Sequence, residues 1–129
     1  TKPVGRFIDP KDIERLYKER GWVIGEDTNR GFRRLVPSPK PIKIMEAPSI
    51  RHLINQGVIV LCCGGGGIPV FEIGNQIQGI EAVIDKDFTS CLLAKDVGIE
   101  HVIISTEEDN IYLNFGKTDQ KTLGTITID

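Results

Sequence analysis

A run of four glycines, Gly64, Gly65, Gly66 and Gly67, follows the apolar stretch 58–63. Glycine loses more backbone freedom on folding than any other residue, so such a run is unfavourable unless bare backbone is needed. Successive N–H groups after a strand can form a concave nest that binds an anion. Glycine also marks places where two backbone segments approach closely. These residues leave two interpretations open, an anion-binding loop and a tight structural crossing.

A lysine between two aspartates, in the order Asp85, Lys86, Asp87, stands at the start of a predicted helix. A neighbouring carboxylate could fix the ammonium of Lys86 so that it faces a phosphate group. The alternative is that Asp85 or Asp87 caps the helix, since aspartate is a common N-cap residue, and that Lys86 is solvated. The triplet therefore indicates either a phosphate-binding lysine or an ordinary helix start.

A polar, turn-rich segment at residues 105–121 carries Tyr112, Phe115 and Lys117. Sites for adenine have apolar and aromatic walls with a few polar groups, so this segment could form one edge of a nucleotide site. An acidic surface turn followed by an edge strand explains the same residues equally well.

The overall composition is that of one soluble globular domain and excludes two classes of partner. The chain has 129 residues, 40% of them hydrophobic, and a formal charge of −2. Because there is no basic excess to neutralise phosphates along a groove, we expect no nucleic-acid binding. The longest apolar run, 58–63, is far too short to cross a bilayer and follows no signal peptide, so we expect no membrane association.

Cysteine and histidine usage indicates a reducing compartment and no protein-held metal. The three cysteines, Cys62, Cys63 and Cys91, do not form a disulfide framework. We expect them to be buried small hydrophobic residues in a cytoplasmic protein. His52 and His101 lack metal-ligand spacing to Cys, Asp or Glu, so we expect both to be structural.

The first part of the chain predicts a helix with clear ends. Asp9 is a natural N-cap, Pro10 suits the first helical position, and Gly21 ends the helix. A hairpin should follow, with strands at 22–26 and 32–36 joined by the polar turn 27–31.

Two arginines and three prolines follow in this unit. Arg33 and Arg34 are expected to solvate the hairpin. Three prolines within residues 37–41 cannot form regular structure. We interpret residues 1–41 as a small excursion and residues 42–129 as part of a main body.

The main body alternates helices with apolar strands. The predicted elements are a helix at 48–57, a buried strand at 58–63, a helix at 86–98 and a buried strand at 101–105, with edge strands at 111–115 and 125–129. The helix at 86–98 should bury Phe88, Cys91, Leu92 and Ala94. This rhythm predicts an α/β layered domain with a mostly parallel sheet.

Several strings in this order resemble the carbamate kinases of the amino acid kinase family. The matching stretches are TKPVG, GFRRLVPSPKPIKI, GVIVLCCGGGGIPV, GIEAVIDKDF and IYLNFGKTDQK. The resemblance runs from one end of the chain to the other. It implies an αβα three-layer sandwich with a mostly parallel sheet, and a small protruding subdomain that maps onto residues 1–41.

The resemblance also implies a reaction and its ligands. Members of the family transfer a phosphoryl group reversibly between ATP and carbamate, giving carbamoyl phosphate and ADP, usually in arginine fermentation running toward ATP. The expected cofactor is ATP or ADP with Mg²⁺, and the expected assembly is a homodimer.

Site residues are carried over by motif. The resemblance implies catalytic roles for Lys2, which would reach the substrate, for Lys86, which would contact the transferring phosphoryl group, and for Asp87, which would orient the lysines. Gly64, Gly65, Gly66 and Gly67 would border the reaction centre. The nucleotide side would include Thr106, Glu107, Tyr112, Phe115 and Lys117. Positive charge placed around the moving phosphate is what this chemistry needs.

An alternative function is a catalytically degenerate binding or regulatory subunit. The family usually reads Thr-Asp-Val in the nucleotide loop, and this chain places Glu107 and Glu108 at the Asp and Val positions. An extra carboxylate that pointed inward would weaken nucleotide binding. The chain also lacks counterparts of the family's Gly-Gly-Asn phosphate loop and of a C-terminal active-site lysine. We therefore expect these 129 residues to be inactive alone.

Overall fold

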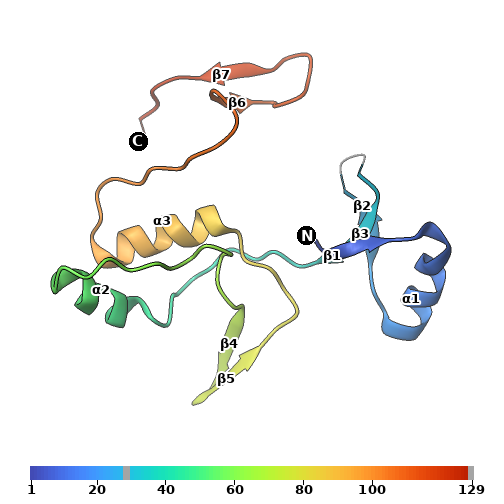
Figure 1. Ribbon diagram of the computed structural model, residues 1–129, viewed down its shortest axis with the longest axis horizontal. Helices are drawn as coiled ribbons and strands as arrows, with labels where there is room; N and C mark the ends of the chain where they lie inside the picture. Colours follow the sequence, from blue (N-terminus) through green and yellow to red (C-terminus); the bar gives the residue numbers. More distant parts are fainter. Residues whose placement is uncertain (28–29, 128–129) are drawn as a thin grey trace.

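The computed structural model describes residues 1–27 and 30–127. Within these residues the chain is α/β, as predicted, with helices and three small antiparallel sheets in sequence. Figure 1 shows separate groups joined by extended segments, with one sheet beside α1, a pair of helices, and two hairpins. Part of the predicted turn 27–31 and of the predicted strand 125–129 lies outside the described residues.

The first sheet contains β1 (Lys2–Ile8), β2 (Ile24–Glu26) and β3 (Phe32–Val36), in the order β1-β3-β2. The pairing of β2 with β3 confirms the predicted hairpin. The strand β1 was not predicted; it pairs with β3 through an irregular register between Val4 and Ile8. Pro3 and Gly5 hide this strand, because both residues are depleted in strands.

The helical part of this unit begins and ends as predicted. The Asp9 carboxylate accepts a hydrogen bond from the backbone N–H of Lys11 at the start of η1 (Pro10–Asp12). The helix α1 (Ile13–Arg20) follows, and Gly21 ends it with a left-handed φ of 64°. This left-handed conformation favours glycine, because glycine has no Cβ atom that would clash with the backbone.

The described hydrophobic core lies between α2 (Ala47–Asn55) and α3 (Lys86–Val97). Its buried residues are Ala47, Ile50 and Leu93. Both helices were predicted. The buried face of α3 differs from the prediction, because it consists of Thr89, Leu93 and Ala94, whereas Phe88 and Cys91 are exposed.

Two hairpins complete the described elements. The first pairs β4 (Val70–Ile73) with β5 (Gln76–Gly79), and the second pairs β6 (Ile111–Leu113) with β7 (Lys121–Leu123). The β4–β5 hairpin was not predicted. The prediction of a strand at 111–115 is confirmed for β6, and residues 125–127 form no strand.

The predicted buried strands at 58–63 and 101–105 are wrong for this structure. Neither segment is a strand, and Ile59, Leu61 and Ile103 are each at least 89% exposed. A strand exists only when a neighbour completes its hydrogen-bond ladder, and no described segment lies in register with either run. Cys62 and Cys91 are therefore exposed rather than buried, and Cys63 is half-buried.

None of the described helices is both long enough and apolar enough to cross a bilayer.

Candidate functional site

An ion pair joins the first strand to the start of α3. The ammonium of Lys2 donates to Oδ2 of Asp85, although the two residues are separated by 83 positions in sequence. The Lys2 side chain is 44% exposed and that of Asp85 is 23% exposed. Lys2 therefore lies at the N-terminus of α3, beside the predicted catalytic pair Lys86 and Asp87.

Asp85 also caps α3 with its other carboxylate oxygen. Oδ1 accepts hydrogen bonds from the backbone N–H of Asp87 at 2.9 Å and of Phe88 at 3.5 Å. The Lys2 ammonium, and then the Asp87 N–H, hold the pKa of the Asp85 carboxyl below its usual range. This agrees with the prediction that an aspartate of the triplet 85–87 caps the helix.

Lys86 and Asp87 form a second, separate pair. The Lys86 ammonium lies 2.9 Å from Oδ1 of Asp87, and both side chains are more than half exposed. The Asp87 carboxylate raises the pKa of Lys86, with a smaller contribution from Asp85, so Lys86 is an ammonium at neutral pH. Each lysine thus has its own carboxylate, with Asp85 holding Lys2 and Asp87 holding Lys86.

The glycine loop packs directly against the same helix start. Gly66 is buried with a φ of +89°, and a Cβ at this position would clash with the backbone carbonyl of Ile84. The hydroxyl of Thr89, only 4% exposed, lies 2.9 Å from the carbonyl oxygen of Gly66 and 3.0 Å from that of Asp85. Gly66 therefore fits the interpretation of the glycine run as a place where two backbone segments approach closely.

The other three glycines face open space. A Cβ at Gly64, Gly65 or Gly67 would meet nothing within 4 Å. The N–H of Gly66 is used within the loop, where it donates to the carbonyl of Cys63 at 2.9 Å. An anion at this loop would consequently be held by N–H groups of the remaining glycines.

Further contacts hold the segment before α3 against β3 and the start of the proline-rich segment. Arg34 donates to Glu81 at 2.7 Å, and the Val83 N–H donates to the Pro37 carbonyl at 3.0 Å. Arg33 bonds the Gly5 carbonyl at 2.9 Å and Asp27 at 3.0 Å. The expectation that both arginines only solvate the hairpin is wrong, since each cross-links distant segments.

The predicted nucleotide-side residues lie in the segment 106–117, where Tyr112 and Phe115 form an aromatic cluster. The Tyr112 hydroxyl donates to Asp109 at 2.5 Å, which raises the pKa of Tyr112, and the Tyr112 and Phe115 ring centroids are 5.7 Å apart. The Thr106 hydroxyl accepts from the Glu108 N–H at 3.3 Å. Glu107 and Glu108 are both exposed.

This cluster is not connected to the glycine loop. No hydrogen bond or ion pair in residues 1–27 and 30–127 links residues 106–117 to the glycines or to Lys86. Figure 1 shows the β6–β7 hairpin beyond α3, separated from β1. The structure thus gathers Lys2, Lys86, Asp87 and the glycines, and leaves the aromatic residues apart.

Two contacts at the site were not predicted from the sequence. Asp85 holds Lys2, and Thr89 ties Gly66 to α3. The position of Thr89, four residues after the cap, was a usable signal, because threonine hydroxyls can bond the carbonyl four residues earlier. No feature of the sequence near Lys2 or Asp85 indicated that these two residues would form an ion pair.

Chemically, the helix start presents two ammonium groups beside a glycine loop. Positive charge and bare backbone N–H groups suit the binding of phosphate oxygens. Among the described residues, no group of three or more His, Cys, Asp or Glu side chains is arranged to hold a metal ion.

Comparisons with known proteins were made for the whole chain. A family model described as the amino acid kinase family matches residues 6–129. Carbamate kinases of Staphylococcus haemolyticus and Thermococcus kodakarensis are each 46% identical over 129 residues. These alignments cover all of this chain but only 42% and 41% of the two relatives. The chain therefore spans about two-fifths of the relatives' length.

Solved structures give the same result. Carbamate kinase from Giardia lamblia bound to AMP-PNP is 40% identical with a TM-score of 0.77, covering 95% of this chain and 39% of that protein. A crystal structure from Aeropyrum pernix K1 is 35% identical with a TM-score of 0.79, covering 95% of this chain and 40% of that protein.

Proposed function

We propose that this chain, which belongs to the amino acid kinase family, supplies part of the phosphoryl-transfer site of a carbamate kinase. The reaction is the reversible transfer of a phosphoryl group from carbamoyl phosphate to ADP, giving carbamate and ATP. Support comes from carbamate kinases that are 44–48% identical over 99–100% of the chain.

The observation that carries the proposal is the double pair at the start of α3. Lys2 and Lys86 come from distant parts of the sequence, and each ammonium is fixed by an adjacent carboxylate. The transition state of phosphoryl transfer spreads negative charge over the equatorial oxygens of the moving group. Ammonium groups that are already positioned stabilise that charge without reorganisation during the reaction.

The glycine loop completes this side of the site. Gly66 locks the loop onto α3, which leaves the backbone of Gly64, Gly65 and Gly67 open to a ligand. Bare N–H groups beside two ammoniums would bind the phosphate oxygens of carbamoyl phosphate or of the nucleotide.

On the nucleotide side, Tyr112 and Phe115 would supply the adenine wall, with Thr106, Glu107 and Lys117 around it. Mg²⁺ would enter with the nucleotide, since this ion is commonly bound by phosphates, waters and one or two carboxylates. The carboxylates at the helix start are already engaged, Asp85 by Lys2 and the helix cap and Asp87 by Lys86, so the phosphates and waters would hold the ion. The proposal extends to a cytoplasmic homodimer acting in arginine fermentation.

A chimeric enzyme tests the proposal. This chain replaces the aligned segment of the Staphylococcus haemolyticus carbamate kinase, and ATP formation from carbamoyl phosphate and ADP is measured beside the parent enzyme. We expect the chimera to turn over. A chimera with the parent's circular dichroism spectrum and size, but without turnover, would contradict the proposal.

The second candidate function is a degenerate nucleotide-binding subunit, favoured by the carboxylates of Glu107 and Glu108. The discriminating measurement is the ADP affinity of the chimera with and without the double change Glu107→Asp, Glu108→Val. A large gain in affinity in the double variant would favour the degenerate subunit. Unchanged tight binding would remove the reason for this alternative.

A further inference from the structure

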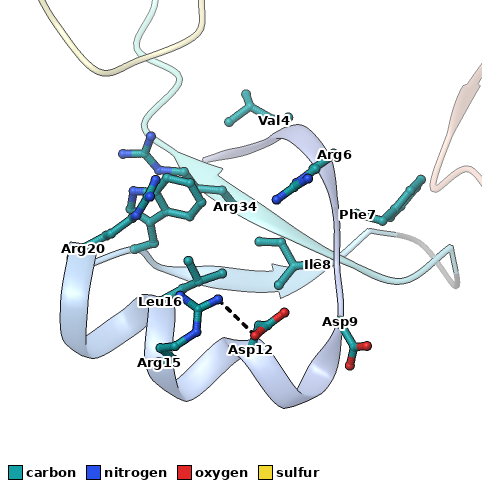
Figure 2. Close-up of a pocket in the computed structure, with 12 residues that line it drawn as sticks. Val4, Arg6, Phe7, Ile8, Asp9, Asp12, Arg15, Leu16, Arg20 and Arg34 are labelled. Atoms are coloured by element: carbon teal, nitrogen blue, oxygen red, sulfur yellow. Dashed lines mark hydrogen bonds and ion pairs between the residues drawn. The ribbon is translucent and has the colours of Figure 1, made fainter.

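A cavity lies within the unit formed by β1, α1, β2 and β3, away from the start of α3. Its volume is about 600 Å³, within the range of small-molecule sites. The cavity lies between β1, α1 and the arginine-bearing part of β3 (Figure 2). Neither Lys2, Lys86 nor the glycine loop lines it.

Four guanidinium groups line this cavity, from Arg6, Arg15, Arg20 and Arg34. Figure 2 shows Arg6 pointing inward from β1, while Arg20 comes from the end of α1. The guanidinium carbons of Arg20 and Arg34 lie 5.1 Å and 4.6 Å from the ring centroid of Trp22, which also lines the cavity. The indole therefore keeps two of the arginines at one wall.

Two of these positive charges are already balanced. Arg34 pairs with Glu81 at 2.7 Å, and Arg15 pairs with Asp12 at 3.0 Å and Glu19 at 3.1 Å. In the described part of the chain, neither Arg6 nor Arg20 has a carboxylate within 4.0 Å.

The acidic residues that line the cavity do not neutralise Arg6 and Arg20. Asp12 is the partner of Arg15, and Asp9 is occupied by the ammonium and backbone N–H of Lys11. The cavity thus keeps an excess of positive charge that its own carboxylates leave uncompensated. Arg6 and Arg20 are both exposed, so their side chains are accessible to a ligand from solvent, and a bound anion would relieve the repulsion between the positive charges.

We propose that this cavity binds a phosphate group, as the free ion or as a phosphate monoester, between the guanidiniums of Arg6 and Arg20. Guanidinium forks match the oxygens of a dianion and form charge-assisted hydrogen bonds that are stronger than neutral ones. The site is separate from the proposed reaction centre and does not depend on the proposed function.

Trp22 provides a direct test, because it is the one tryptophan of the 129-residue chain. Its emission is followed while the chain is titrated with inorganic phosphate, and separately with glycerol 3-phosphate, at constant ionic strength set with sodium chloride. Calorimetry of the same titrations gives the stoichiometry. We expect a saturable change with one site for at least one of the two ligands.

Arg6→Gln and Arg20→Gln should each weaken binding by about tenfold or more, the effect of losing one charge-assisted hydrogen bond. Arg30→Gln is the matched control, because it removes a positive charge from the same unit outside the cavity, where Arg30 pairs with Asp27 at 3.3 Å. Saturation by the monoester alone would identify a larger phosphorylated ligand as the occupant.

The proposal is overturned if the emission change does not saturate, if chloride reproduces it, or if both cavity variants bind as the control does. Circular dichroism establishes whether each variant is folded. If a cavity variant does not fold, the saturation and stoichiometry of the unmodified chain still decide the question.

Discussion

Lys2 and Asp85 form an ion pair that fastens the first strand to the N-terminus of α3 across 83 positions of sequence. The same carboxylate caps the helix through its second oxygen. One side chain therefore fixes both an ammonium and the helix that carries Lys86. This relationship leads to the first two predictions.

A double-mutant cycle with Lys2→Gln and Asp85→Asn measures this pair. Asparagine keeps an oxygen that can cap α3 but loses the charge. We expect a coupling free energy of about 0.5–1 kcal/mol in urea unfolding of the chain, since the pair is partly exposed. The exposed pair Lys18 and Glu14, within α1, should give a smaller value. A coupling indistinguishable from zero would mean that the contact does not persist in solution.

The pH dependence of stability should carry the signature of Asp85. Its pKa is lowered in the folded chain, first by Lys2 and then by the Asp87 N–H. Its stabilising contribution is therefore fully present above the unfolded pKa of about 3.9 and is lost as the pH falls through the lower, folded pKa. The difference between the unmodified chain and Asp85→Asn isolates this term from that of Asp27, whose pKa is also lowered. Identical acid profiles for the two proteins would contradict it.

Alanine substitutions in the glycine run should separate its structural position from its open ones. Gly66→Ala places a Cβ against the Ile84 carbonyl at a φ of +89°. The left-handed φ alone should lower the free energy of unfolding by about 1–2 kcal/mol, with displacement of the loop in addition. Gly65→Ala, which meets nothing within 4 Å, should be tolerated. Equal effects of the two changes in urea unfolding would disprove this assignment.

The buried hydroxyl of Thr89 should be needed to hold the loop on α3. Thr89→Val keeps the shape but leaves the Gly66 carbonyl without its donor. We expect a loss of about 1–3 kcal/mol in thermal or urea unfolding. Thr89→Ser keeps the hydroxyl and should lose only the methyl contribution, about 1 kcal/mol or less. A serine variant less stable than the valine variant would show that packing, not the hydrogen bond, matters here.

Features with a local signal could be predicted from the sequence. The caps Asp9 and Asp85 and the terminator Gly21 occupy their expected positions, because capping depends on residues within one turn. The β4–β5 hairpin also had a signal, since Gly74 and Asn75 separate two strand-like runs. This hairpin lies shortly after the glycine run and was not predicted.

Features that depend on distant partners could not be predicted locally. The apolar runs 58–63 and 101–105 look like buried strands, but hydrophobicity does not reveal whether a neighbouring strand is present. The joining of Lys2 to Asp85 likewise depends on where the start of β1 lies relative to the N-terminus of α3. The assignment of Lys2 and Lys86 to one proposed site rests on the family resemblance and not on their spacing in the sequence. The division at residue 41 and the site roles stay predictions.

The most direct test of the central claim is the rate of ATP formation by the chimeric kinase carrying Lys86→Gln. The Lys86 ammonium is assigned to the charge of the moving phosphoryl group, so kcat should fall by about 10²–10³-fold. Lys95→Gln, an exposed change near the other end of α3, should leave the rate unchanged. A Lys86→Gln enzyme with the kcat of the Lys95→Gln control would contradict the proposed site.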